Sequence, residues 1–163
     1  MKSSQRLLLA IALALPLSLA GNVFAAETAA HEHGSATQSM ELNAGHKWTI
    51  DAPLRQAMNK IHASVTTTLS AIHDGKLTDT QYDAFANGVN DQFTYIVENC
   101  KLEPQADAQL HIVLGNMMTG IEIARGKEQG QERETGVIKI AQTMNAYGEY
   151  FDHTDWKNFK LAH

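Results

Sequence analysis

Four long segments of this chain carry apolar residues at alternating spacings of three and four, which is the period of one face of an α-helix. The pattern covers residues 52–73, 79–100, 104–125 and 135–152. Short polar links separate these segments, and no segment alternates apolar with polar residues as a half-buried strand does. We therefore expect an all-α protein. Because short links join antiparallel neighbours, the expected architecture is an antiparallel up-down-up-down four-helix bundle.

Local signals at the segment ends support these helices. Asp51 is a good N-cap residue, Thr78 and Gln81 have the spacing of a capping box, and Pro104 suits the first position of a helix. Gly75 is expected to close the first helix. The residues predicted to face the core are Leu54, Met58, Ile61, Val65, Thr68, Ile72, Tyr82, Phe85, Ala86, Val89, Phe93, Ile96, Val97, Cys100, Leu110, Leu114, Met117, Ile121, Ala124, Val137, Ile140, Ala141, Met144, Tyr147, Gly148 and Phe151.

The first 25 residues have the pattern of a secretory signal peptide. Lys2 and Arg6 form a positive start, residues 7–20 are apolar, and small side chains precede a predicted cleavage after Ala25. Cleavage there leaves 11 Lys and Arg against 18 Asp and Glu, a net charge of −7. We expect an acidic, exported protein, most simply a periplasmic one.

Residues 26–45 are expected to be disordered, because small and polar residues dominate them without any period. His31 and His33 lie in this segment, and paired histidines in a flexible tail can capture Cu(II), Ni(II) or Zn(II). The competing interpretation is a solvated tail with incidental histidines. Folded structure is expected to begin near His46, so that residues 46–163 form the bundle domain.

Composition and missing motifs exclude several classes of function. The 163 residues carry a net charge of −5, which disfavours binding driven by nucleic-acid phosphates. After the signal segment, no apolar stretch is long enough to cross a bilayer. The sequence lacks the zinc-protease, nucleophile-elbow, Walker and Rossmann patterns and offers no clear base and nucleophile, so we expect a protein that is not an enzyme.

The expected topology places several reactive residues at one pole of the bundle. The start of the first helix, the end of the second, the start of the third and the end of the fourth meet there. These segments carry Met58, Cys100, His111 and His153. Sulfur and imidazole together form a soft-to-borderline ligand set, which suits copper first. Asp107 precedes His111 by four residues and is expected to orient its imidazole.

Each of these residues also has a purely structural interpretation. Met58 and Cys100 follow the core period, and both residue types are common fillers of cores. His111 can hydrogen-bond locally, and a protonated His153 at a helix C-terminus would complement the helix dipole. The sequence therefore leaves two functions open: a metal-binding bundle, with a metal-delivery or redox protein as partner, and a cofactor-free structural or partner-binding bundle. A homodimer is compatible with both.

Three segments resemble a family of small secreted proteobacterial proteins labelled DnrO-like. They are residues 48–58 (WTIDAPLRQAM), 99–111 (NCKLEPQADAQLH) and 147–153 (YGEYFDH), and the resemblance extends over nearly the whole mature chain. The label of that family implies a link to denitrification or the nitric-oxide response.

A second resemblance is architectural. Cytochrome b562 is a periplasmic four-helix bundle that binds haem without covalent attachment, with a Met early in its first helix and a His late in its fourth. Met58 and His153 are similar in position. This resemblance implies a third function, binding of b-type haem for electron transfer or gas sensing, with Met58 and either His153 or His111 as axial ligands.

Overall fold

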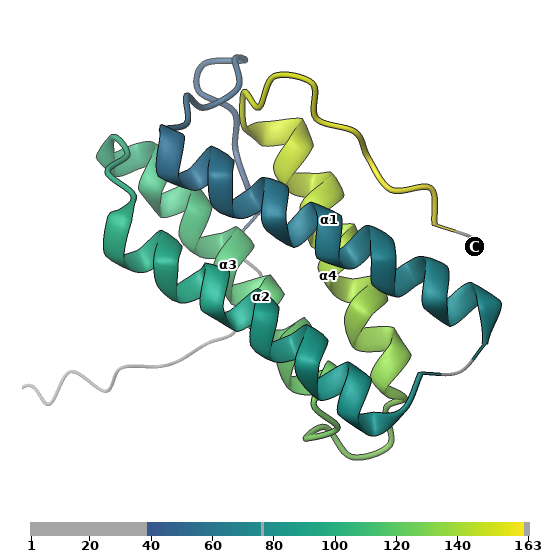
Figure 1. Cartoon of the computed structure of the whole chain (residues 1–163). Helices are drawn as coiled ribbons and strands as arrows, with labels where there is room; N and C mark the ends of the chain where they lie inside the picture. Colours follow the sequence, from purple (N-terminus) through teal and green to yellow (C-terminus); the bar gives the residue numbers. More distant parts are fainter. Residues whose placement is uncertain (1–38, 76, 162–163) are drawn as a thin grey trace, which may run out of the picture. The chain divides into compact units, whose positions relative to one another are not determined.

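The computed structural model describes residues 39–75 and 77–161. Four helices make up this part of the chain: α1 (Ala52–Asp74), α2 (Asp79–Asn99), α3 (Pro104–Ala124) and α4 (Arg133–Tyr150) (Figure 1). The prediction of an all-α four-helix bundle is confirmed. The expected signal peptide and the histidine pair His31 and His33 lie outside the described residues.

The local signals in the sequence fix the starts of the first two helices. The Asp51 carboxylate accepts a hydrogen bond from the Leu54 amide at 2.9 Å, and Thr78 and Gln81 form both bonds of a capping box. Helices α1, α2 and α3 therefore match their predicted ranges within one residue at each end.

Helix α4 is displaced from its predicted range. It begins at Arg133 instead of residue 135, and it ends at Tyr150 instead of residue 152. The early end has a non-local cause: the Trp48 amide donates to the Tyr150 carbonyl, and the Asp152 amide donates to the Trp48 carbonyl, both at 2.8 Å. The backbone after Tyr150 thus pairs with the segment before α1 instead of continuing the helix.

Hydrogen bonds between the helix ends define the two poles of the bundle. At one pole the Lys101 amide, which follows α2, donates to the Asp51 carboxylate at the start of α1. At the other pole Arg133, at the start of α4, bonds the Asp83 side chain near the start of α2 and the Arg125 carbonyl after α3. Figure 1 shows successive helices running in opposite directions. The predicted grouping of helix ends at one pole is therefore confirmed.

Helix α3 packs most extensively on α4, and α1 packs on α2. The close approach of α3 to α4 depends on two glycines: a side chain on Gly120 would meet the Ile140 side chain at 2.6 Å, and one on Gly136 would meet the Gly120 carbonyl oxygen at 2.5 Å. Helix α3 packs less extensively on α2 than on α4. Val97 was predicted to widen the core stripe of α2, and this is wrong, since its side chain is 64% exposed.

Two segments outside the helices also pack against the bundle. The chain is already folded before His46, where we expected structure to begin: the Glu41 amide donates to the Gln109 side chain of α3 at 2.8 Å, and Met40 packs on the core. The disorder predicted for residues 26–45 therefore does not extend over residues 39–45, because these contacts to α3 hold them.

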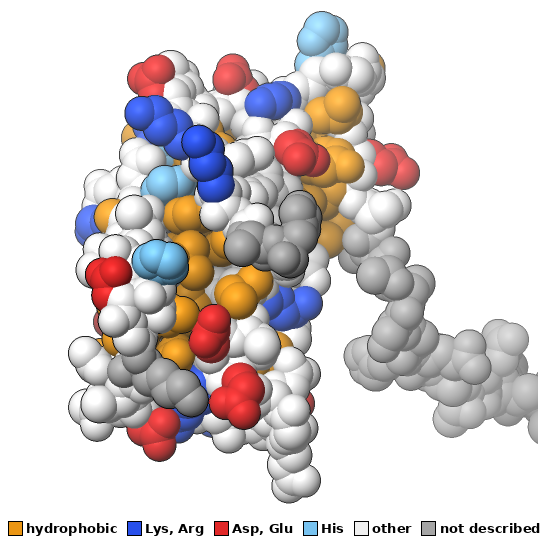
Figure 2. All heavy atoms as spheres, turned by 90° about the vertical axis from the view of Figure 1, so that its right-hand side faces the viewer, with side chains coloured by type: hydrophobic (Ala, Val, Ile, Leu, Met, Phe, Trp, Pro, Cys, Tyr) orange, Lys and Arg blue, Asp and Glu red, His pale blue; other side chains and the backbone are white. Residues whose placement is uncertain are grey.

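The C-terminal tail, residues 151–161, runs back along the bundle. It is held by the Asn145 side chain, which bonds the Phe159 backbone at 3.0 and 2.7 Å, and by a 2.7 Å bond between His62 Nε2 and the Lys157 carbonyl. Figure 2 shows the side of the molecule toward which this tail runs, with apolar side chains visible between charged ones. None of the described helices is both long enough and apolar enough to cross a bilayer.

Candidate functional site

The predicted ligands at the shared pole fall into two groups. The first group, which we call the Cys100 corner, consists of Asp51, Cys100, Asp107 and His111, around the link between α2 and α3. The second group is His153 with the aromatic side chains beside it. Met58 is completely buried in the core.

Asp51 holds the Cys100 corner together. One carboxylate oxygen caps α1 through the Leu54 amide, and the other accepts a 2.7 Å hydrogen bond from the Lys101 amide. Lys101 directly follows Cys100, so this single side chain ties the start of α1 to the backbone beside the thiol. A carboxylate shared between two backbone donors is a strong, charge-assisted arrangement.

Cys100 is half-buried at the end of α2, where its amide donates to the Ile96 carbonyl at 2.9 Å. Burial raises the pKa of the thiol to about 12, and the charge and hydrogen bond of Asp51 and the charge of Asp107 act in the same direction. The sulfur is therefore protonated at neutral pH. A metal bound there would have to displace that proton.

His111 is oriented by Asp107 as the spacing predicted. Its Nδ1 lies 2.9 Å from the Asp107 carbonyl oxygen and 3.4 Å from a carboxylate oxygen of the same residue. Both partners are acceptors, so Nδ1 must carry the ring proton. The lone pair is then on Nε2, and the His111 side chain is 70% exposed. This is the tautomer and orientation that a metal-binding imidazole requires.

Asp107 is the element that relates the thiol to the imidazole. Its carboxylate contacts the His111 ring, and its charge acts on the Cys100 thiol. Within the described ranges, however, no three His, Cys, Asp or Glu side chains are grouped so that they could hold a metal ion together. The corner therefore contains one sulfur and one imidazole, and the Asp107 carboxylate contacts the imidazole.

His153 is engaged elsewhere. The residue is 7% exposed, and its Nδ1 lies 3.0 Å from the buried hydroxyl of Tyr147. Burial lowers the pKa of His153 to about 4, and the charges of Arg55 and His62 lower it further. The imidazole is therefore neutral at neutral pH, which contradicts the interpretation of His153 as a cation at the helix C-terminus.

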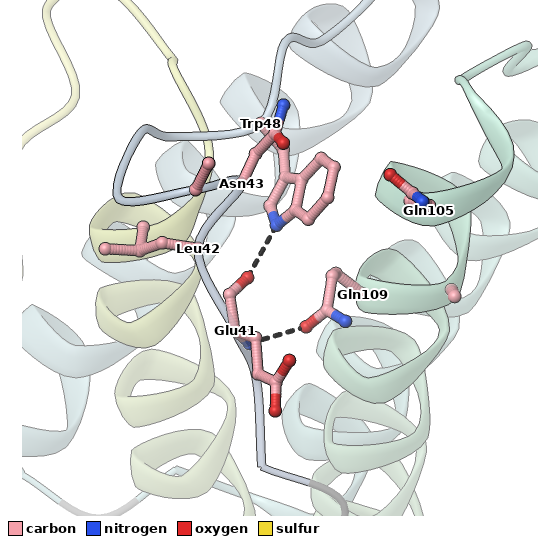
Figure 3. Close-up of a pocket in the computed structure, with 8 residues that line it drawn as sticks. Glu41, Leu42, Asn43, Trp48, Gln105 and Gln109 are labelled. Carbon is pink, nitrogen blue, oxygen red and sulfur yellow. Dashed lines mark hydrogen bonds between the residues drawn. The ribbon is translucent and has the colours of Figure 1, made fainter.

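A shallow pocket of about 360 Å³ lies on the other side of the start of α3 (Figure 3). The Trp48 indole donates to the Glu41 carbonyl at 2.6 Å, and the Gln109 side chain accepts from the Glu41 amide. These polar groups already have hydrogen-bond partners within the protein. We therefore interpret the pocket wall as a structural contact between residues 41–48 and α3. Sequence analysis did not predict this pocket, since its wall includes residues 41–44, which were expected to be disordered.

Sequence reasoning also missed the aromatic surroundings of His153. Trp156 packs with ring-centroid distances of 4.9 Å to Tyr147 and 4.7 Å to His153, and it lies where a side chain on Gly148 would project. His62, which the sequence did not single out, stacks on Phe159 at 4.3 Å. The dense aromatic and histidine content of residues 147–159 was the available signal.

Comparison of the chain with protein-family models gave no match, and comparisons with curated proteins and with solved structures gave none either.

Proposed function

We propose that this chain is an exported, non-enzymatic metal-capture protein, with copper(I) as its first candidate ion and Cys100 and His111 as the donors. The observation that carries the proposal is the position of Asp107, which contacts His111 and influences the Cys100 thiol. Copper(I) prefers soft sulfur and borderline imidazole donors. We infer a periplasmic location from the signal pattern of residues 1–25 and a metal-delivery or redox protein as the partner.

The proposal is tested by titrating the full-length protein with copper(I) in the presence of a colorimetric copper(I) chelator, without oxygen. We expect saturation at one equivalent. Cys100→Ser should abolish this binding, and His111→Ala should weaken it strongly. Asp107→Asn should weaken it less than His111→Ala does, because it removes the carboxylate charge beside the His111 ring and keeps the backbone carbonyl that accepts from Nδ1.

Matched controls separate the corner from other histidines. His73→Ala removes an exposed imidazole at the end of α1, at the opposite pole, and should leave the affinity unchanged. A double substitution of His31 and His33 by Ala tests the N-terminal pair. Copper binding that survives Cys100→Ser, or that is lost only with the histidine pair, would contradict the assignment to the corner.

The second candidate is a cofactor-free bundle in which the corner is purely structural. The two backbone bonds of Asp51 favour it, because they stabilise the metal-free fold. It predicts no saturable copper binding, together with a lower unfolding temperature for Cys100→Ser in metal-free buffer. A parallel titration with hemin tests the haem function, which predicts a Soret band that His153→Gln removes.

A further inference from the structure

A second chemical group at the same pole is not used by the proposed metal site. Tyr147 is completely buried, and its hydroxyl lies 3.0 Å from His153 Nδ1. The Trp156 ring contacts both partners, with centroids 4.9 Å from Tyr147 and 4.7 Å from His153. A buried phenol in the last turn of α4 and an imidazole and an indole that follow the helix therefore form one contiguous cluster.

The Tyr147–His153 pair is arranged for coupled movement of an electron and a proton. Burial raises the pKa of Tyr147 far above its ordinary value, so the phenol does not ionise at neutral pH. Loss of an electron makes a phenol strongly acidic, and the proton then needs a base within hydrogen-bond reach. With its ring proton on Nε2, the neutral His153 offers the Nδ1 lone pair as that base.

Trp156 connects this buried pair to the outside of the molecule. Trp156 is only half-buried, and its ring centroid lies 5.0 Å from that of His62, a partly exposed residue of α1. His62 in turn stacks on Phe159 of the tail. Tyr147, Trp156, His62 and Phe159 thus form a series in which each ring packs on the next. An electron therefore has an aromatic path between Tyr147 and the surface.

The unpaired indole nitrogen of Trp156 argues against a purely structural role for this ring. Its Nε1 is buried and has no hydrogen-bond partner among residues 39–75 and 77–161. An unsatisfied buried donor destabilises a fold, and a phenylalanine in the same place has no such donor. A tryptophan differs from phenylalanine in being readily oxidised, which is the property a relay requires.

We propose that Trp156, Tyr147 and His153 form a proton-coupled redox relay. An outer-sphere one-electron oxidant at the surface removes one electron from the Trp156 indole and is itself reduced. The indole radical cation then takes one electron from Tyr147 and returns to its neutral form. The Tyr147 O–H bond breaks as its proton moves to His153 Nδ1, which leaves a neutral tyrosyl radical and an imidazolium. The relay does not depend on copper.

The experiment is flash photolysis of the full-length, metal-free protein with a photogenerated ruthenium(III) tris-bipyridine as the oxidant. Transient absorption and electron paramagnetic resonance identify the radicals. We expect a tryptophan radical that converts into a tyrosyl radical, with a slower conversion in D₂O. Tyr147→Phe removes only the hydroxyl and should abolish the tyrosyl signal, while the tryptophan radical persists.

Two further variants test the path and the base. Trp156→Phe should reduce the yield of the tyrosyl radical at least tenfold, and His153→Gln should slow its formation at least tenfold and remove the D₂O effect. Tyr95→Phe, on α2, is the matched control and should change nothing. Circular dichroism confirms that each variant is folded. A tyrosyl signal that persists in Tyr147→Phe, or conversion rates that His153→Gln leaves unchanged, would overturn the relay.

Discussion

Asp51 is the side chain on which the fold and the candidate site both depend, so Asp51→Ala is the sharpest test of the structure. The substitution removes the N-cap bond to Leu54, worth about 1 kcal/mol. It also removes the charge-assisted bond to the Lys101 amide, worth about 1–2 kcal/mol at this exposed position. We expect a loss of about 2–3 kcal/mol in the free energy of unfolding, or about 10 °C in Tm for a domain of this size.

Urea unfolding followed by circular dichroism measures this loss, and a second variant apportions it. Asp51→Ser keeps a cap acceptor and, with its shorter side chain, gives up the bond to Lys101, so it should recover about 1 kcal/mol relative to Asp51→Ala. Equal stability of the two variants, or a loss within the ±0.5 kcal/mol typical of ordinary surface sites, would refute the reasoning.

The same variants have a chemical readout at Cys100. The carboxylate contributes its charge and a hydrogen bond to the raised pKa of the thiol, and burial contributes most. In Asp51→Ala the pKa of Cys100 should therefore fall below about 12 yet stay above its ordinary value. The pH dependence of iodoacetamide alkylation measures it. An unchanged profile would show that the carboxylate does not act on the sulfur.

Two further predictions concern the helix packing and the response to acid. Gly136→Ala places a methyl group against the backbone of Gly120 and Ala124, so we expect α3 and α4 to separate at a loss of about 3 kcal/mol in urea unfolding, whereas Gly115→Ala, with open space around it, should not destabilise. His153 has a folded-state pKa of about 4, so the unfolded chain takes up its proton first as the pH falls below 6.5. Stability should decline from pH 6.5 to 4 by at most about 3 kcal/mol and then level off, and His153→Gln should remove that decline.

The features that the sequence predicted well are those set by neighbours in the chain. Asp51, Thr78 and Gln81 cap their helices through bonds that span three residues, and Asp107 reaches His111 over a single helical turn. Such contacts need no knowledge of the tertiary structure. The shared pole also followed, because the directions of four helices joined by short links decide which ends meet.

The features that escaped prediction depend on contacts between distant segments. The end of α4 at Tyr150 is set by Trp48, about a hundred residues earlier in the chain. The close approach of α3 to α4 depends on Gly120 and Gly136, and the exposure of Val97 depends on which helices pack beside it. Apolar periodicity reports which face of a helix is buried, and it cannot report how widely the neighbouring helices cover that face.

The protonated thiol limits which ions could bind at the proposed metal site. With a pKa of about 12, Cys100 gives up its proton only to an ion whose bond to sulfur outweighs the burial of the thiol and the nearby carboxylates. Harder divalent ions would favour the carboxylates and leave the thiol protonated, because carboxylate oxygen suits such ions and thiolate suits soft ones. If the proposed metal site exists, the raised pKa of Cys100 would therefore favour soft ions, and copper(I) is the soft ion proposed here.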